Sequence, residues 1–167
     1  MSDIINRVAQ SKLITFDLEE LYPEGKREVL DIKDWLHEGI ILREKEFRYA
    51  LEENDWSNYQ DTYVAVTCST DAIVPGWAFM LVASKLNGYA NKVVVGNLED
   101  LEASLFQTIL DDLDVSGLKD KPVIIKGCSN KPVPENAYIM AMTKIQKVAK
   151  SIMYGEACSA VPLFKRK

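Results

Sequence analysis

The sequence predicts an α/β protein in which helices cover both faces of a mostly parallel sheet in three layers, with an antiparallel hairpin added at the N-terminal side. Two patterns support this prediction. Between residues 13 and 32, apolar and polar side chains alternate, which is typical of strands with one face in solvent. From residue 62 onward, short runs that are apolar on both faces alternate with helix-length segments, which predicts a β-α-β-α-β-α-β order.

The N-terminal third is expected to form the hairpin and one helix. Residues 13–32 contain two alternating strands joined by a turn at 22–25, where a proline fixes φ and a glycine permits a positive φ. Residues 40–54 are expected to form a helix with one solvated face, because apolar side chains are spaced among many charges. Residues 1–12 are expected to add a short helix.

The remaining strands are expected at 62–68, 92–95, 122–126 and 151–154, separated by helices at 76–90, at 98–112 and from Pro134 onward. Strands joined by helices of this length pair in parallel through right-handed crossovers, so one sheet is expected to hold all four. Asn97 is expected to cap the helix at 98–112, with Asp100 in its first turn near the positive end of the helix.

The composition is that of an ordinary globular protein. The 167 residues are 47% hydrophobic and 27% charged, which predicts a single domain over 1–167. The net charge of −5 and the absence of a basic stripe argue against a nucleic-acid partner. The apolar runs are too short to span a membrane, and the N-terminus has no signal-peptide core, so we expect a cytoplasmic protein. A homo-oligomer or a protein partner stays open.

Each of the three cysteines lies just past a predicted strand: Cys68, Cys128 and Cys158. In one parallel sheet, the carboxyl ends of the strands share an edge, which is where open α/β folds bind ligands. The predicted topology therefore brings the three thiols together. Thiolates form a soft site suited to zinc or an iron–sulfur cluster, and Asp71 and Glu156 are the candidates for a fourth ligand.

Two other interpretations stay open, so the sequence does not decide whether the protein is an enzyme. The first is an enzyme with a nucleophilic or redox cysteine. Cys128 is favoured for this role, because Lys126 and Lys131 flank it and a nearby cation lowers the pKa of a thiol. The second is an interaction module with purely structural thiols, since a free cysteine packs like a small hydrophobic residue. The sequence contains no GxGxxG, GxxxxGK[ST], GxSxG or HExxH motif, which disfavours ordinary nucleotide binding and the commonest hydrolases.

Several longer stretches carry a resemblance to a known family: FDLEELYPEG, DIKDWLHEGIILREKEFR, VTCSTDAIVPGWAFML, IKGCSNKPVP and SIMYGEACSAVPLFKRK. Over its whole length the chain resembles an uncharacterised family of bacterial proteins known as a domain of unknown function. This resemblance implies no particular activity. As a ligand set alone, the three cysteines with Asp71 are similar to the sites of iron–sulfur scaffold proteins, although the spacing and the predicted topology differ.

Overall fold

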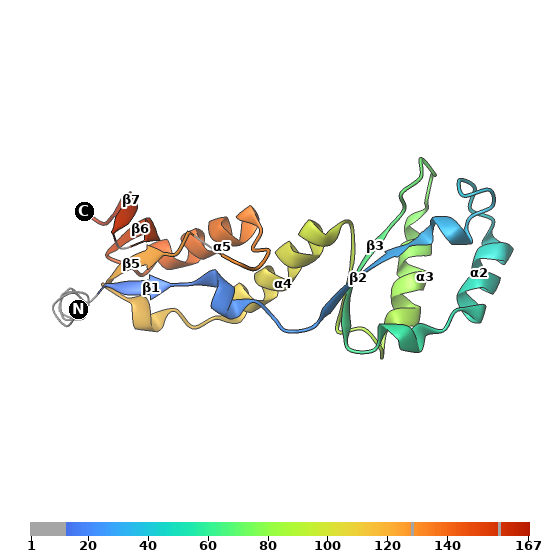
Figure 1. Cartoon of the computed structure of the whole chain (residues 1–167), viewed down its shortest axis with the longest axis horizontal. Helices are drawn as coiled ribbons and strands as arrows, with labels where there is room; N and C mark the ends of the chain where they lie inside the picture. The colour runs from blue at the N-terminus through green and yellow to red at the C-terminus, as the bar shows by residue number, and fades with distance from the viewer. Residues whose placement is uncertain (1–12, 128, 157) are drawn as a thin grey trace. The chain divides into compact units, whose positions relative to one another are not determined.

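The computed structural model describes residues 13–127, 129–156 and 158–167, and it divides into two compact units (Figure 1). Unit 1 consists of the chain up to Pro23 together with the chain from Leu105 to the C-terminus, and unit 2 runs from Glu24 to Ser104. Each unit has its own sheet and its own hydrophobic core. The short helix expected at 1–12 lies outside the described residues.

Unit 2 contains a three-stranded parallel sheet in the order β2-β3-β4. The strands are β2 (Lys26–Asp31), β3 (Thr62–Thr67) and β4 (Lys92–Val95). The helices are α2 (Glu44–Glu53), α3 (Gly76–Leu86) and the first part of α4 (Leu98–Asp112), with the short 3-10 turns η2 (Ile32–Trp35) and η3 (Trp56–Tyr59).

The core of unit 2 joins one face of this sheet to α2 and α3 (Figure 1). Val64 and Val66 point to this face from β3, and both are fully buried. Ala65, which points the opposite way along the strand, is fully buried as well. The central strand is therefore covered on both faces, as its continuous apolar run predicts.

A buried ion pair joins β2 to α4 inside unit 2. Arg27 Nε lies 2.6 Å from Glu102 Oε1, and the two side chains are only 12% and 6% exposed. The Arg27 guanidinium also lies 5.0 Å from the centre of the Tyr63 ring. The start of α4 is capped as predicted, because the Asp100 N–H donates to Asn97 Oδ1 over 2.9 Å and the Asn97 N–H donates to Asp100 Oδ2 over 2.8 Å.

Unit 1 contains a four-stranded sheet in the order β1-β5-β6-β7. Its strands are β1 (Ile14–Phe16), β5 (Pro122–Ile125), β6 (Ser151–Glu156) and β7 (Ser159–Lys165). Its helices are α5 (Glu135–Gln146) and the second part of α4, with the short 3-10 turns η1 (Leu18–Leu21) and η4 (Ser116–Leu118). The pairs β1–β5 and β5–β6 are parallel, and β6–β7 is antiparallel.

The core of unit 1 lies between this sheet and the helices. Val123 and Ile152 are fully buried on the strands, and Phe106 is fully buried on α4. From α5 come Ala137 and Ala141, which stand one turn apart and are fully buried. These small side chains allow the backbone of the helix to approach the strands closely.

The predicted class and order of elements are confirmed. From β3 to β6 the chain follows a β-α-β-α-β-α-β order, and the strands pair mostly in parallel. The helix expected at 40–54 begins later, at Glu44, because His37 and Ile41 exchange backbone hydrogen bonds of 2.7 and 3.0 Å that close a tight turn ahead of it.

The single sheet expected to hold all four strands is wrong, since β3 and β4 form one sheet and β5 and β6 belong to another. The antiparallel hairpin at 13–32 is wrong too, because β1 pairs in parallel with β5 and β2 pairs in parallel with β3. Alternation of apolar and polar side chains reports which face of a strand is buried, but it does not identify the neighbouring strand. The single domain expected over 1–167 stays a prediction.

The C-terminal strand β7 has no counterpart in the sequence prediction. It contains Pro162, and a proline is tolerated on the outer strand of a sheet, which is where β7 lies. Throughout the described part of the chain, every helix is too short or too polar to cross a lipid bilayer.

Candidate functional site

The structure distributes the predicted metal ligands over both units. Cys68 and Asp71 follow β3 in unit 2, whereas Glu156 and Cys158 lie at the β6–β7 turn in unit 1. Cys128 lies outside the described residues. The premise that one sheet edge collects all three thiols is therefore wrong, because β3 and β6 belong to different sheets. Among the residues that the structure describes, no three His, Cys, Asp or Glu side chains form a group that could hold a metal ion.

Cys68 lies in a half-buried position and packs against the core of unit 2. Its Sγ lies 3.4 Å from Thr70 Oγ1, and that hydroxyl donates to the Gly39 carbonyl over 2.6 Å. The thiol thus belongs to a small network that joins two loops of unit 2. Asp71, three residues further along the chain, is exposed. These contacts are those of a packing cysteine.

The parallel strands of unit 1 end together at one edge of their sheet. Phe16 of β1, Ile125 of β5 and Tyr154 of β6 lie side by side in register. The residues that follow β1 and β5 directly are Asp17 and Lys126, which are both polar. This carboxyl edge of unit 1 is the position where parallel sheets present their functional side chains.

An ion pair crosses this carboxyl edge. Lys126 Nζ lies 3.5 Å from Asp17 Oδ2, and the two side chains are partly exposed. The Asp17 carboxylate raises the pKa of the Lys126 amine, and the carboxylates of Glu156 and Glu19 add to the rise. Lys126 therefore keeps a positive charge at neutral pH beside Asp17 and Glu19, which follow β1, and Glu156, which ends β6.

The β6–β7 turn presents Cys158 at the same edge. Glu156 and Ser159 are paired across this tight hairpin, and the Cys158 side chain is exposed in the turn between them. Gly155 has a φ of +119°, and a Cβ at this position would lie 2.7 Å from the Ser159 carbonyl oxygen. Only glycine fits there without strain, so the hairpin that carries the thiol depends on Gly155.

In the loop after β5, the residues on either side of position 128 form hydrogen bonds within unit 1. The Tyr154 hydroxyl donates to the Gly127 carbonyl over 3.3 Å. The Ser129 hydroxyl donates to the Lys131 carbonyl over 2.8 Å, and it accepts from the Lys131 N–H over 3.2 Å. Lys131 Nζ lies 5.4 Å from the centre of the Tyr22 ring. Gly127 and Ser129 thus have defined partners within unit 1.

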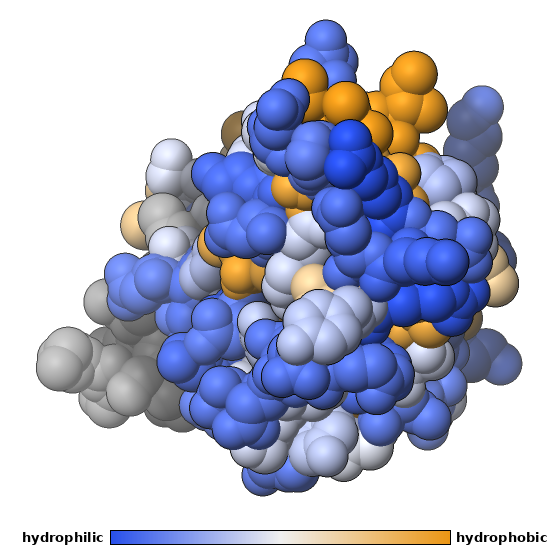
Figure 2. All heavy atoms as spheres, turned by 90° about the vertical axis from the view of Figure 1, so that its right-hand side faces the viewer, coloured by the Kyte–Doolittle hydropathy of each residue, from blue (hydrophilic) through white to orange (hydrophobic). Residues whose placement is uncertain are grey.

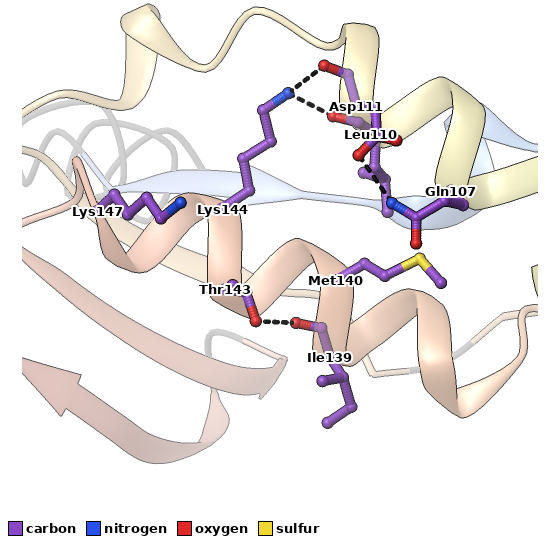
Figure 3. A pocket seen from close by; sticks show the side chains of 8 residues that line it. All are labelled: Gln107, Leu110, Asp111, Ile139, Met140, Thr143, Lys144 and Lys147. Carbon is purple, nitrogen blue, oxygen red and sulfur yellow. Dashed lines mark hydrogen bonds between the residues drawn. The ribbon is translucent and has the colours of Figure 1, made fainter.

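A groove of about 440 Å³ lies between α5 and the second part of α4 (Figure 3). Lys144 donates from this groove to the carbonyl oxygens of Asp111, over 3.0 Å, and of Leu110. Gln107 Nε2 donates to Asp111 Oδ1 over 2.7 Å. Lys144, one of two lysines in the lining, thus satisfies carbonyls at the end of α4, which is a structural role. The carboxyl edge of unit 1 is therefore the stronger candidate site.

Unit 2 exposes hydrophobic side chains at its loops, and Figure 2 shows such side chains gathered at the upper end of a mostly hydrophilic face. Ile73 is 94% exposed in the loop after β3, and Ile40 and Ile41 are about half exposed in the loop before α2. Thr70 and Gly39 hydrogen-bond these two loops to each other. This group of side chains was not predicted from the sequence, where its signal is the placement of isoleucine next to turn residues.

The pairing of Asp17 with Lys126 was not predicted from the sequence either. The alternating pattern of residues 13–32 predicts a hairpin, in which Asp17 would lie on the solvated face. The alternating pattern of β1 could not identify the pair, because it fits a parallel partner as well as a hairpin partner.

Comparison with known proteins gives one match. The family model described as a protein of unknown function (DUF2480) matches residues 2–166, which is essentially the whole chain. The curated proteins and the solved structures that were compared give no match. The chain therefore belongs to the DUF2480 family.

Proposed function

We propose that the carboxyl edge of unit 1 binds a soft metal ion, either zinc or the iron of an iron–sulfur cluster, through Cys128 and Cys158 with Glu156 as an oxygen ligand. One observation carries the proposal. β5 and β6 are parallel neighbours with Ile125 opposite Tyr154, so the segments that follow both strands leave the sheet at one edge. Cys128 is the third residue after β5, and Cys158 is the second residue after β6.

The electrostatics of this edge support the proposal. A metal ligand must be deprotonated, and a nearby cation favours the thiolate over the thiol. Lys126 supplies such a cation, since Asp17 and Glu156 raise the pKa of its amine. Two thiolates and one carboxylate form a ligand set that suits zinc, with a fourth position left for water or a substrate.

The proposed ligand set differs from the one expected from the sequence. Cys68 and Asp71 belong to unit 2, so they are left out. We place the protein in the cytoplasm, where thiols stay reduced and available to a metal.

Metal analysis of single-cysteine variants tests the proposal. The full chain is purified without oxygen, and its zinc and iron contents are measured together with its visible spectrum. We expect stoichiometric metal in the native protein and in Cys68→Ser, which is the matched control. Cys128→Ser and Cys158→Ser should each lose the metal, because two remaining ligands cannot hold it.

Three results would contradict the proposal. Loss of metal in Cys68→Ser would restore the three-cysteine site expected from the sequence. A metal-free native protein with one thiol that is alkylated rapidly near neutral pH would favour a nucleophilic or redox cysteine. A metal-free protein whose thiols are all inert would favour an interaction module.

A further inference from the structure

The end of the unit 1 sheet opposite the carboxyl edge brings together cations from separate stretches of the chain. The Lys150 N–H donates to the Lys121 carbonyl over 2.9 Å, and these two residues directly precede β6 and β5. The Arg166 N–H donates to the Lys150 carbonyl over 2.9 Å, and Arg166 directly follows β7, which runs antiparallel to β6. Lys121, Lys150 and Arg166 therefore stand in one row across three neighbouring segments of the chain.

Two more lysines lie beside this row. Lys165 is the last residue of β7, and Lys147 directly follows α5, next to Val148, whose carbonyl accepts the Asp120 N–H over 2.9 Å. These five exposed cations form what we call the basic edge: Lys121, Lys147, Lys150, Lys165 and Arg166. Arg166 Nη2 donates to Asp120 Oδ1 over 2.5 Å, whereas the four lysine side chains form no hydrogen bond or ion pair within the described part of the chain.

A row of like charges on neighbouring strands is unfavourable in itself. Strands lie about 4.8 Å apart, so the row places three cations within about 10 Å of sheet width. Like charges directly opposite one another destabilise a sheet. Asp120 pairs with Arg166 and leaves the lysines uncompensated, although the chain as a whole carries a net charge of −5. An anionic partner relieves this repulsion. The sequence shows no basic stripe, because the three stretches are far apart in the chain.

The outer strand β7 exposes apolar side chains next to the basic edge. Val161 is 58% exposed and Leu163 is 50% exposed, and Pro162 between them is exposed as well. Leu163 stands only two residues before Lys165. Exposed apolar side chains that adjoin charged ones mark surfaces that bind a partner or a membrane. Cations combined with exposed aliphatic side chains are typical of proteins that lie on an anionic lipid surface.

We propose that the basic edge docks unit 1 on an anionic lipid surface, with the lysines among the head-group phosphates and Leu163 in the apolar layer beneath them. Four of the five cations are lysines, which act as point charges and need no bidentate partner, so they suit a diffuse layer of phosphates. Each lysine or arginine close to an anionic leaflet adds to the binding. A nucleic acid also presents phosphates, but it has no apolar layer that could accept Leu163.

Sedimentation of the full chain with lipid vesicles tests the proposal. Vesicles of phosphatidylcholine and phosphatidylglycerol in equal parts should bind the native protein at low salt, whereas vesicles of phosphatidylcholine alone should not. Salt at about 1 M, which screens charges beyond about 3 Å, should release the protein. Lys150→Glu and Lys121→Glu should each weaken binding about 30-fold, because each removes a cation and adds an anion. Lys45→Glu makes the same change at an exposed lysine of α2 in unit 2 and is the matched control, which should bind as the native protein does.

Further arms of the experiment separate lipid from other anions. Leu163→Asn should weaken vesicle binding several-fold, and unchanged binding would contradict the proposal, since the apolar contact distinguishes a bilayer from a soluble polyanion. Glycerol phosphate in excess should not displace the protein, and displacement would assign the basic edge to a free phosphate compound. The proposal is overturned if the native protein ignores the mixed vesicles, if both lysine variants bind as the native protein does, or if a DNA duplex is bound in preference to the vesicles. Because the substituted side chains are exposed, circular dichroism should show native secondary structure for every variant.

Discussion

The contact between Arg27 and Glu102 is the most buried ion pair described in unit 2. Arg27 Nε donates to Glu102 Oε1 over 2.6 Å, and Nη2 donates to Oε2 over 3.2 Å. A third donor, Nη1, reaches the Gly25 carbonyl over 2.7 Å. A fully paired buried charge adds little net stability, but a buried charge that loses its partner is costly. The pair links β2 to the first part of α4 within unit 2.

Removing one partner of this pair should cost more than removing both. We expect Glu102→Leu to lower the free energy of unfolding by about 3–5 kcal/mol, because the Arg27 charge stays buried without its carboxylate. The double substitution Arg27→Met with Glu102→Leu should recover most of that loss. Urea unfolding measures both values. A loss below about 1 kcal/mol in Glu102→Leu would show that the pair is hydrated in solution.

Asp31 links the stability of unit 2 to pH. Its Oδ1 accepts the N–H groups of Lys33, over 3.1 Å, and Ser69, over 3.2 Å. Desolvation raises the pKa of Asp31, but the hydrogen bonds from Ser69 and Lys33 outweigh it, so the pKa lies below its ordinary value. A carboxyl whose pKa is lower in the folded state stabilises the fold above its unfolded pKa of about 4. This stabilisation is lost as the pH falls through the folded pKa.

Asp31→Asn isolates that contribution, because the amide oxygen still accepts both N–H groups but carries no charge. We expect the native protein to be more stable than Asp31→Asn at pH 7, and the difference to vanish in acid below the folded pKa. Urea unfolding of both proteins between pH 7 and pH 2.5 measures the difference in their free energies of unfolding. A difference that stays constant over this range would mean that the charge of Asp31 does not contribute.

At the scale of single elements, the sequence predicts contacts between residues that are close in the chain and misses contacts between residues that are far apart in it. The cap formed by Asn97 and Asp100 is predicted correctly because both partners lie within one helical turn. The pairing of β1 with β5 is missed because Ile14 and Val123 are far apart in the chain. Their apolar character shows only that each strand is buried, and many pairings satisfy that condition.

The β6–β7 hairpin depends on one glycine. Gly155 has a φ of +119° and approaches the Ser159 carbonyl, so Gly155→Ala introduces both backbone strain and a clash. We expect a loss of at least about 1 kcal/mol in the free energy of unfolding. Gly117→Ala is the matched control, since Gly117 lies in the same unit with open space around its Cβ position. Equal stabilities of the two variants in urea would contradict this role of Gly155.

At the scale of the whole molecule, the sequence predicts the shared carboxyl edge of the candidate site but not the change of sheets. The rule that parallel strands share a carboxyl edge holds in unit 1, where β1, β5 and β6 end together. It does not extend to Cys68, because the chain changes sheets between β4 and β5. α4 connects these strands and has the length of an ordinary crossover helix, so the β-α-β pattern is the same whether the chain returns to one sheet or begins another.

The change of sheets raises the question of how many cooperative units the chain contains. The boundary between the units falls inside α4, between Ser104 and Leu105. A helix forms cooperatively, so its two parts stabilise each other. We therefore expect the single domain predicted from the sequence to unfold in one transition.

Two probes separate the units in a urea titration. The three tryptophans, Trp35, Trp56 and Trp77, all belong to unit 2, so their fluorescence follows that unit, whereas far-ultraviolet circular dichroism follows both. We expect the two curves to coincide in the native protein and in Ser104→Ala. Ser104→Pro interrupts α4 at a cost of about 3 kcal/mol and should separate the curves. A native protein whose circular dichroism falls in two steps, with fluorescence following only one, would show that the units are separate domains.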